Sequence, residues 1–266
     1  ARWMAFPKSV DEVRTLLRLA REAETPVRLL GAGTNVLAPD EGVDALVICL
    51  KDALLGMTLL DGNRLEIMAG QTLAQAAVFA RRNGLTGMEF AHGIPGTLGG
   101  GVYMNAGAYG GEMRQVVRQV TFLHADGCLE TFENEACAFG YRTSAFENVS
   151  GVIVSAELAL QPGAPEEIEA RMRELMEKRR ASQPLELPSA GSTFKRPEGH
   201  FAGALIQEAG LKGQGVGGAK VSEKHAGFVV NFDHATAADV RGTIALVQKK
   251  VLETSGVRLE PEVRIW

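Results

Sequence analysis

Hydrophobic positions in the first part of the chain recur first at helical and then at strand spacing. Ser9 and Glu12 have the spacing of a capping box, and apolar residues follow them at intervals of three and four. This pattern predicts a helix that runs to about Glu24. Short apolar runs bounded by turn residues, among them Asp61-Gly62, predict strands after it. The predicted strands are 27–30, 45–50 and 64–69, and this pattern of helix and strands indicates a small α/β lobe. We place the first lobe at about residues 1–54.

The middle of the chain combines one helical pattern with alternating segments. Thr72 and Gln75 form a second capping pattern before a helix, and Gly84 stands where a helix ends. Two strands, 116–123 and 128–132, flank a turn and predict a hairpin. Segment 151–160 alternates apolar with small or polar residues, as a half-buried strand does. We therefore predict a second lobe over about residues 55–160, built on a largely antiparallel sheet.

A break in both periodicities near residue 161 separates a third part of the chain. Two prolines and a glycine lie within 161–165, and a charged helix follows, acidic at its start and basic at its end. The remaining pattern predicts helices at 202–209 and 237–255, the second capped by Thr236, and strands at 228–232 and 258–265. The prediction is an α+β chain with domains 1–160 and 161–266.

Composition narrows the possible partners. The 266 residues are 45% hydrophobic and 23% charged, with a formal net charge of −4, which gives no electrostatic reason to expect nucleic acid or an anionic membrane. No apolar run is long enough to span a bilayer, and we expect no secretory leader, although a short segment is expected to precede Ala1. Three cysteines lie far apart, which favours reduced thiols in the cytoplasm over disulfides or a metal site. No metal is predicted.

Two glycine-rich segments give the strongest indication of ligand binding. Segment 93–107 holds six glycines and a proline in fifteen positions, and segment 31–35, Gly-Ala-Gly-Thr-Asn, directly follows a predicted strand. Glycine costs a regular element about 0.5–1 kcal/mol relative to alanine, so this density favours backbone amides that approach phosphate oxygens closely. Counted from Gly31, the sixth residue is Val36, whereas the dinucleotide-binding fingerprint has a glycine there. Two such loops predict two lobes that hold one elongated phosphate-bearing ligand; the alternative is glycine that merely relieves strain in turns.

Three further segments carry reactive side chains. Ser192 follows a glycine and precedes Lys195 and Arg196, but no Gly-x-Ser-x-Gly elbow surrounds it, so a proton-donor role fits better than a hydrolase nucleophile. Arg142 has the planar fork that binds a carboxylate, and Glu262 at a strand start can move or steer a proton. Taken alone, each residue also fits a purely structural role: the serine could cap a turn, and the other two could form surface ion pairs.

The order of these motifs resembles one enzyme family along nearly the whole chain. Segments 31–35, 93–107, 140–144 (Gly-Tyr-Arg-Thr-Ser), 190–195, 209–213 and 261–264 occur as in the UDP-N-acetylenolpyruvoylglucosamine reductases, flavoenzymes of bacterial cell-wall precursor synthesis. The resemblance implies a two-lobed FAD-binding domain of the vanillyl-alcohol-oxidase type followed by an α+β substrate-binding domain, with the last strand, 258–266, returning to the active site. It further implies tightly bound, non-covalent FAD, NADPH as hydride donor, and UDP-N-acetylglucosamine enolpyruvate as the substrate reduced to UDP-N-acetylmuramate.

The resemblance also assigns roles to individual residues. Arg142 would hold the enolpyruvyl carboxylate and stabilise the enolate, Glu262 would assist there, and Ser192 would donate the final proton with help from Lys195. Substrate contacts are expected at Tyr141, Lys195, Arg196, Lys212, Lys220 and His225. Cofactor contacts are expected at Gly31, Ala32, Gly33, Thr34, Asn35, Gly93, Ile94, Pro95, Gly96, Thr97, Gly99, Gly100, Asn105, Ala106 and Gly107.

The chain departs from the family pattern in two places, and two other functions compete. Its length leaves no room for the tyrosine loop of the longer class, and the N-terminal strand is abbreviated. A different FAD oxidoreductase of the same cofactor fold would keep the glycine loops without the set Arg142, Ser192 and Glu262. A non-enzymatic nucleotide-sugar binding protein would be colourless, whereas a flavoprotein is yellow.

Overall fold

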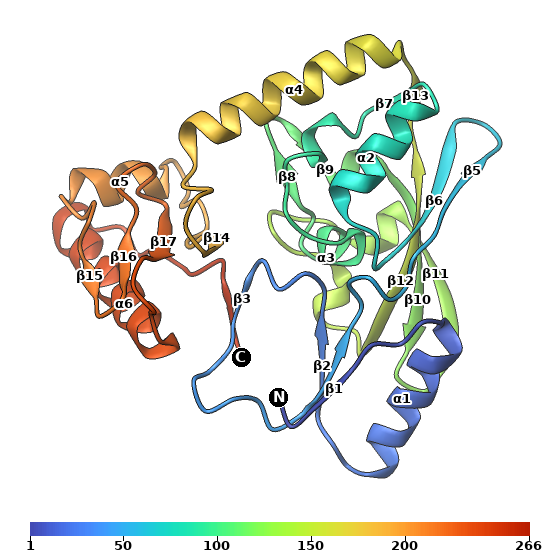
Figure 1. The fold of residues 1–266 in the computed structure, drawn as a ribbon, viewed down its shortest axis with the longest axis horizontal. Helices are drawn as coiled ribbons and strands as arrows, with labels where there is room; N and C mark the ends of the chain where they lie inside the picture. The colour runs from blue at the N-terminus through green and yellow to red at the C-terminus, as the bar shows by residue number, and fades with distance from the viewer. The chain divides into compact units, whose positions relative to one another are not determined.

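The computed structural model describes residues 1–266, and three of its helices, α1, α2 and α6, begin where the capping patterns predicted (Figure 1). The side chains of Ser9, Thr72 and Thr236 each accept a hydrogen bond from the backbone N–H three residues later, which satisfies one of the donors left open at a helix start. The helices are α1 Val10–Glu22, α2 Leu73–Arg82, α3 Leu98–Tyr103, α4 Pro165–Ser182, α5 Ala202–Glu208 and α6 Ala237–Ser255. None of them combines the length and apolar character that a membrane span requires.

The chain divides into two compact units whose boundary differs from the predicted one near residue 161. The first unit comprises residues 1–32 and 44–177, and the second comprises 33–43 and 178–266. The start of α4 belongs to the first unit because Ile168 and Met172 pack into its core. Segment 33–43 belongs to the second unit because β3 (Val36–Leu37) pairs in parallel with β18 (Arg264–Ile265). A pairing across more than 220 residues leaves no mark in a local hydrophobic pattern.

The first unit contains two main sheets. The small parallel sheet has the order β1-β4-β2, and the larger antiparallel sheet has the order β11-β10-β12-β6-β5. The strands are β1 Trp3–Ala5, β2 Val27–Leu30, β4 Leu46–Cys49, β5 Met57–Leu60, β6 Arg64–Met68, β10 Val117–His124, β11 Leu129–Glu133 and β12 Gly151–Ala159. Short pairs β7 Leu85–Thr86 with β13 Gln161–Pro162 and β8 Gly107–Ala108 with β9 Gly111–Glu112 complete the unit.

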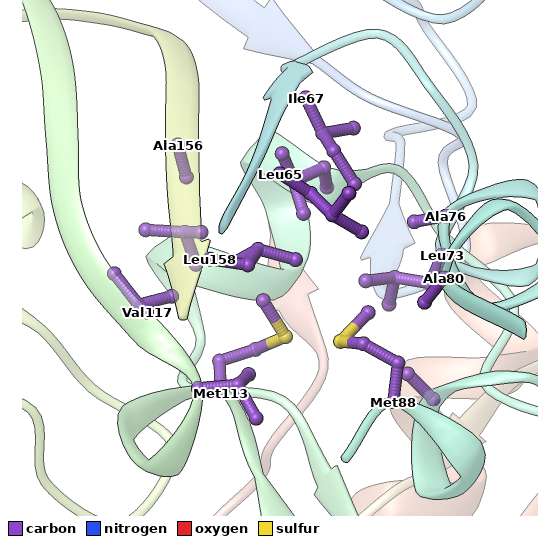
Figure 2. Packing of buried hydrophobic residues seen from close by; sticks show 14 of the residues in the cluster. Leu65, Ile67, Leu73, Ala76, Ala80, Met88, Met113, Val117, Ala156 and Leu158 are labelled. Atoms are coloured by element: carbon purple, nitrogen blue, oxygen red, sulfur yellow. The ribbon is translucent and has the colours of Figure 1, made fainter. Parts of the chain in front are cut away.

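Strand β12 is buried on both faces, so the prediction of a half-buried strand was wrong. Ala156 and Leu158 face the main core, where Figure 2 shows Leu158 directed toward Leu65 and the sulfur atoms of two methionines. Val152 and Val154 instead join a second cluster with residues of α1 and β4. The strand is central in its sheet and sandwiched between two apolar layers, so serine and alanine in it are buried as well as the large residues.

The second unit has a four-stranded antiparallel sheet and two helices packed around a separate core. The sheet order is β14-β17-β16-β15, formed by Ser189–Ser192, Phe228–Asn231, Ala219–Val221 and Gly215–Val216. Phe194, Ile206 and Val247 are among its buried residues. The predicted strand 258–265 was wrong in extent, because only Arg264 and Ile265 form a strand. Around Pro261 the chain makes an isolated bridge to Phe194 instead.

Candidate cofactor and active site

The second glycine loop contains a short helix that the sequence did not predict, and part of its glycine content has a packing cause. Thr97 caps α3, its Oγ1 accepting the N–H of Gly100 at 3.3 Å. A Cβ on Gly99 would lie 3.0 Å from the Cβ of Ala69, and one on Gly101 would lie 3.1 Å from Leu73. These two glycines therefore let α3 pack closely on its neighbours, which is not the ligand approach that the glycine density suggested.

The two glycine loops meet within the first unit. A Cβ added to Gly31 would lie only 2.6 Å from Oγ1 of Thr97, so the start of the first loop lies directly against the cap of α3. The backbone N–H groups of Gly31, Ala32, Gly96 and Thr97 donate no hydrogen bond within the chain. Such open amides beside glycine form the kind of concave donor group that binds phosphate oxygens.

Segment 140–144 is fastened to the end of the second glycine loop by side-chain hydrogen bonds. Ser144 donates to the carbonyl of Tyr103 at 2.7 Å, and Arg142 donates through Nη2 to the carbonyl of Gly107 at 3.1 Å. The amide of Asn105 donates to Gly140 at 2.9 Å and to Glu112 at 3.0 Å, and its oxygen accepts the N–H of Arg114. Asn105 is 1% exposed, so its side chain shapes this loop, and its contact with a cofactor stays a prediction.

Arg142 stands at the corner of a tight turn in a conformation that few residues adopt. The N–H of Gly140 donates to the carbonyl of Thr143 at 3.0 Å, and Arg142 has φ of 56°. Left-handed backbone at a non-glycine residue is uncommon and costs free energy, so the surrounding hydrogen bonds must hold it. Its guanidinium carbon lies 5.2 Å from the ring centre of Tyr141. The turn thus presents an arginine and a tyrosine next to the predicted cofactor loop.

In the second unit, three segments that the sequence singled out converge on Glu262. Its N–H donates to the carbonyl of Thr193 at 2.8 Å, and its carbonyl accepts the side-chain amide of Asn35 at 3.2 Å. The carbonyl of Asn35 in turn accepts the N–H of Arg264 at 3.0 Å. Thr34 is also a neighbour of Gly191, since a Cβ added to Gly191 would lie 4.0 Å from the carbonyl oxygen of Thr34. The end of the first glycine loop, the serine segment and the glutamate segment are therefore one cluster.

Ser192 ends β14 with an exposed side chain whose hydroxyl makes no hydrogen bond within the chain. The ammonium of Lys195 lies 3.7 Å from the carboxylate of Glu260. The predicted assistance of Ser192 by Lys195 therefore has no direct contact to support it. An exposed hydroxyl without an internal partner is nevertheless free to bind a ligand group.

The other predicted substrate residues all belong to the second unit, apart from Tyr141. The guanidinium of Arg196 lies 4.4 Å from the ring centre of Phe201, and the ammonium of Lys220 lies 4.6 Å from that of Phe232. Nδ1 of His225 accepts the N–H of Gly227 at 3.1 Å. Burial lowers the pKa of His225, and the nearby positive charge of Lys212 lowers it further. The histidine is thus held as a neutral, oriented ring.

Two buried polar atoms in the first unit belong to residues that the sequence did not assign to the site. Oε1 of Gln71 and Nδ1 of His92 have no hydrogen-bond partner. Burial lowers the pKa of His92, and the positive charge of Arg81 adds to the effect. His92 directly precedes the second glycine loop, and the carbonyl of Gln71 accepts the N–H of Leu98 within it at 2.8 Å. A polar residue between a glycine and a helix cap was the only signal at position 71.

Comparison with known proteins matches both parts of the chain to known protein families. A model described as "FAD binding domain" matches residues 1–133, and one described as "UDP-N-acetylenolpyruvoylglucosamine reductase, C-terminal domain" matches residues 183–266. A UDP-N-acetylenolpyruvoylglucosamine reductase of Limosilactobacillus reuteri is 49% identical over 265 residues, which cover 100% of this chain and 88% of the relative. The chain belongs to the UDP-N-acetylenolpyruvoylglucosamine reductase family. The enzyme of that name from Lactiplantibacillus plantarum is 46% identical, with 100% and 87% covered.

A solved structure supports the same family assignment. The crystal structure of the UDP-N-acetylenolpyruvylglucosamine reductase from Thermus caldophilus matches 99% of this chain and 91% of its own, with a TM-score of 0.83 and 35% identity. The predicted fold class, an FAD-binding domain of the vanillyl-alcohol-oxidase type followed by an α+β domain, is confirmed. So is the prediction of an FAD-dependent oxidoreductase of this reductase family. The two alternatives, a different FAD oxidoreductase of the same cofactor fold and a non-enzymatic nucleotide-sugar binding protein, have no support beside this match.

Proposed function

We propose that the chain reduces the enolpyruvyl group of UDP-N-acetylglucosamine enolpyruvate to give UDP-N-acetylmuramate, with NADPH as hydride donor, in peptidoglycan precursor synthesis. Membership of the reductase family over the full length of the chain supports this reaction. The residue assignment is supported by the backbone of Glu262, whose N–H donates to the carbonyl of Thr193 and whose carbonyl accepts the side-chain amide of Asn35. These bonds bring the glutamate, the serine segment and the end of the first glycine loop into one cluster.

The residues of the glycine loops fit FAD. Open N–H groups at Gly31, Ala32, Gly96 and Thr97 suit diphosphate oxygens, and the buried, unpartnered oxygen of Gln71 lies in the adjoining segment. When bound, FAD relays a hydride from NADPH to the terminal methylene carbon of the enolpyruvyl group. We propose that the FAD-binding domain covers residues 1–160 and that residues 161–266 bind the substrate, which fits the two matched family models.

Arg142 is the proposed anchor of the substrate carboxylate. As hydride reaches the methylene carbon, negative charge develops on the neighbouring carbon and spreads into the carboxylate. A guanidinium bound to that carboxylate interacts more strongly with the charge as it grows, which lowers the barrier. The strained backbone of Arg142 and its bond to Gly107 hold the guanidinium in place before the substrate arrives.

Ser192 is the proposed proton donor, and Glu262 is proposed to organise the proton supply. The carbanion takes a proton at the carbon that bears the carboxylate, so one hydride and one proton saturate the double bond. A serine hydroxyl is a weak acid, so a neighbouring group must assist Ser192 when it gives up its proton. Because Lys195 pairs with Glu260, we propose that Glu262 or an ordered water returns a proton to Ser192. Tyr141, Arg196, Lys212, Lys220 and His225 are proposed to bind the nucleotide-sugar part of the substrate.

We also propose that the enzyme works in the cytoplasm on these small molecules, without a nucleic-acid or membrane partner. NADPH and nucleotide sugars are cytoplasmic metabolites, and the three cysteines are free thiols. The net charge of −4 supports the absence of a polyanionic partner.

The test separates the two half-reactions by anaerobic mixing of the yellow protein, first with NADPH and then with substrate. Ser192→Ala is expected to leave flavin reduction unchanged and to slow reoxidation by substrate by about 100-fold or more. Ser189→Ala, at the exposed start of the same strand, is the matched control and should change neither step. If Ser192→Ala reoxidises at the wild-type rate, the proton-donor assignment is wrong.

Glu262→Gln and Arg142→Lys test the other two roles in the same assay. Both are expected to slow the substrate half-reaction more than the NADPH half-reaction, because Glu262→Gln removes a charge and Arg142→Lys removes the planar fork of donors that would hold the developing enolate. Equal loss in both steps would indicate a displaced loop or a folding defect and would contradict the proposed roles.

A further inference from the structure

Gln71 lies at the junction between the large sheet of the first unit and the second glycine loop. It follows Gly70 and precedes Thr72, the cap of α2. Its carbonyl accepts the N–H of Leu98 at 2.8 Å, and the N–H of Leu73 donates to the carbonyl of Gly96 at 3.1 Å. These two bonds bracket Thr97, so the backbone of Gln71 is fixed against the loop that carries the open N–H groups.

The side chain of Gln71 differs from every other buried polar side chain of the protein. Nine polar or charged residues are buried, and eight of them form side-chain hydrogen bonds: Thr97, Asn105, Ser144, Ser155, Glu157, Thr193, Ser222 and Thr243. Gln71 is 8% exposed, and its Oε1 is the one buried oxygen without a partner. A buried carbonyl left unpaired is costly, so its persistence indicates a donor supplied from outside the chain.

We propose that Oε1 of Gln71 accepts a hydrogen bond from FAD and is a binding residue for the cofactor. The donor must be an N–H or O–H group, which excludes the diphosphate and leaves the ribityl or ribose hydroxyls, the adenine amino group and N3–H of the flavin ring. This inference rests on the proposed placement of FAD at the two glycine loops. It adds a residue from outside both loops to the cofactor site.

Replacement by leucine tests the proposal because it separates cofactor binding from folding. Leucine has a similar volume and removes the unpaired oxygen, so the apoprotein of Gln71→Leu should melt about 2–6 °C higher than wild-type apoprotein. The same variant should bind FAD about 3- to 10-fold more weakly when apoprotein is titrated with FAD and flavin fluorescence is followed. Gln207→Leu, an exposed glutamine on α5, is the control for the chemical change and should alter neither the FAD affinity nor the melting temperature by these amounts.

A residue that serves only the fold gives the opposite pattern. Unchanged FAD affinity in Gln71→Leu, or a lower melting temperature of its apoprotein together with weaker binding, would overturn the proposal. Titration with FMN and with ADP then locates the donor: loss of FMN affinity places it in the flavin half, and loss of ADP affinity places it in the adenosine half. Failure of wild-type protein to bind FAD would instead refute the placement of the cofactor itself, which the wild-type titration reveals before any variant is compared.

Discussion

Replacement of Gly31 by alanine tests whether the contact between the two glycine loops is essential. The added Cβ would lie 2.6 Å from Oγ1 of Thr97, closer than real Cβ contacts come, whereas its other nearest atoms lie at 3.8 Å. Thr97 can relieve this clash only by turning its hydroxyl away from the N–H of Gly100. The cap of α3 would then be lost, at a cost of about 1 kcal/mol, with a further 0.5–1 kcal/mol or so for the strained side chain.

The expected result is a destabilisation of about 1.5–2 kcal/mol, which corresponds to a fall in melting temperature of roughly 3–8 °C for a unit of this size. A double-mutant cycle with Thr97→Ala isolates the clash. Thr97→Ala alone should cost about 1 kcal/mol through loss of the cap. In that background the new Cβ of Gly31→Ala meets only ordinary contacts, and the variant should be neutral or slightly stabilised because alanine restricts the unfolded chain.

Thermal unfolding of the four apoproteins, with titration of each by FAD, measures both effects. The affinity for FAD should fall in Gly31→Ala, because a displaced first loop no longer aligns its N–H groups with those of Gly96 and Thr97. If Gly31→Ala costs the same free energy with and without Thr97→Ala, the two loops do not touch in the way described and the reasoning fails.

Two other predictions concern the second unit. The carboxylate of Asp40 accepts the N–H groups of Ala237 at 2.6 Å and Ala238 at 3.0 Å at the start of α6, so Asp40→Ala should destabilise the protein by about 1–3 kcal/mol in urea unfolding, with Asp40→Asn intermediate; an unchanged midpoint would contradict this. His225 has its pKa lowered by burial below the ordinary 6.5, so the unfolded chain binds the proton first and stability should fall as the pH drops below about 6.5. His225→Gln should remove that part of the pH dependence in urea midpoints measured between about pH 7.5 and 5.5, and an identical profile in both proteins would count against it.

Local sequence determined the helices other than α3, the strands β2, β4, β6, β10, β11, β12 and β17, and the motifs. Capping residues and apolar spacing act within one or two turns of chain, so Ser9, Thr72 and Thr236 mark their helices without reference to the fold. Turn chemistry likewise predicted the hairpin of β10 and β11. The glycine loops and the reactive segments were recognisable because close approach and proton transfer demand particular residue types at particular spacings.

The tertiary structure decided which of these segments meet and what each side chain does there. Gly31 and Thr97 touch across 66 residues of sequence, and Asn35 binds the backbone of Glu262 across 227, distances over which no periodic pattern extends. The same packing uses the amide of Asn105 within the loop, buries β12 on both faces and leaves Oε1 of Gln71 without a partner. Burial and hydrogen-bond pairing depend on all neighbours at once, and those neighbours come together only when the chain has folded.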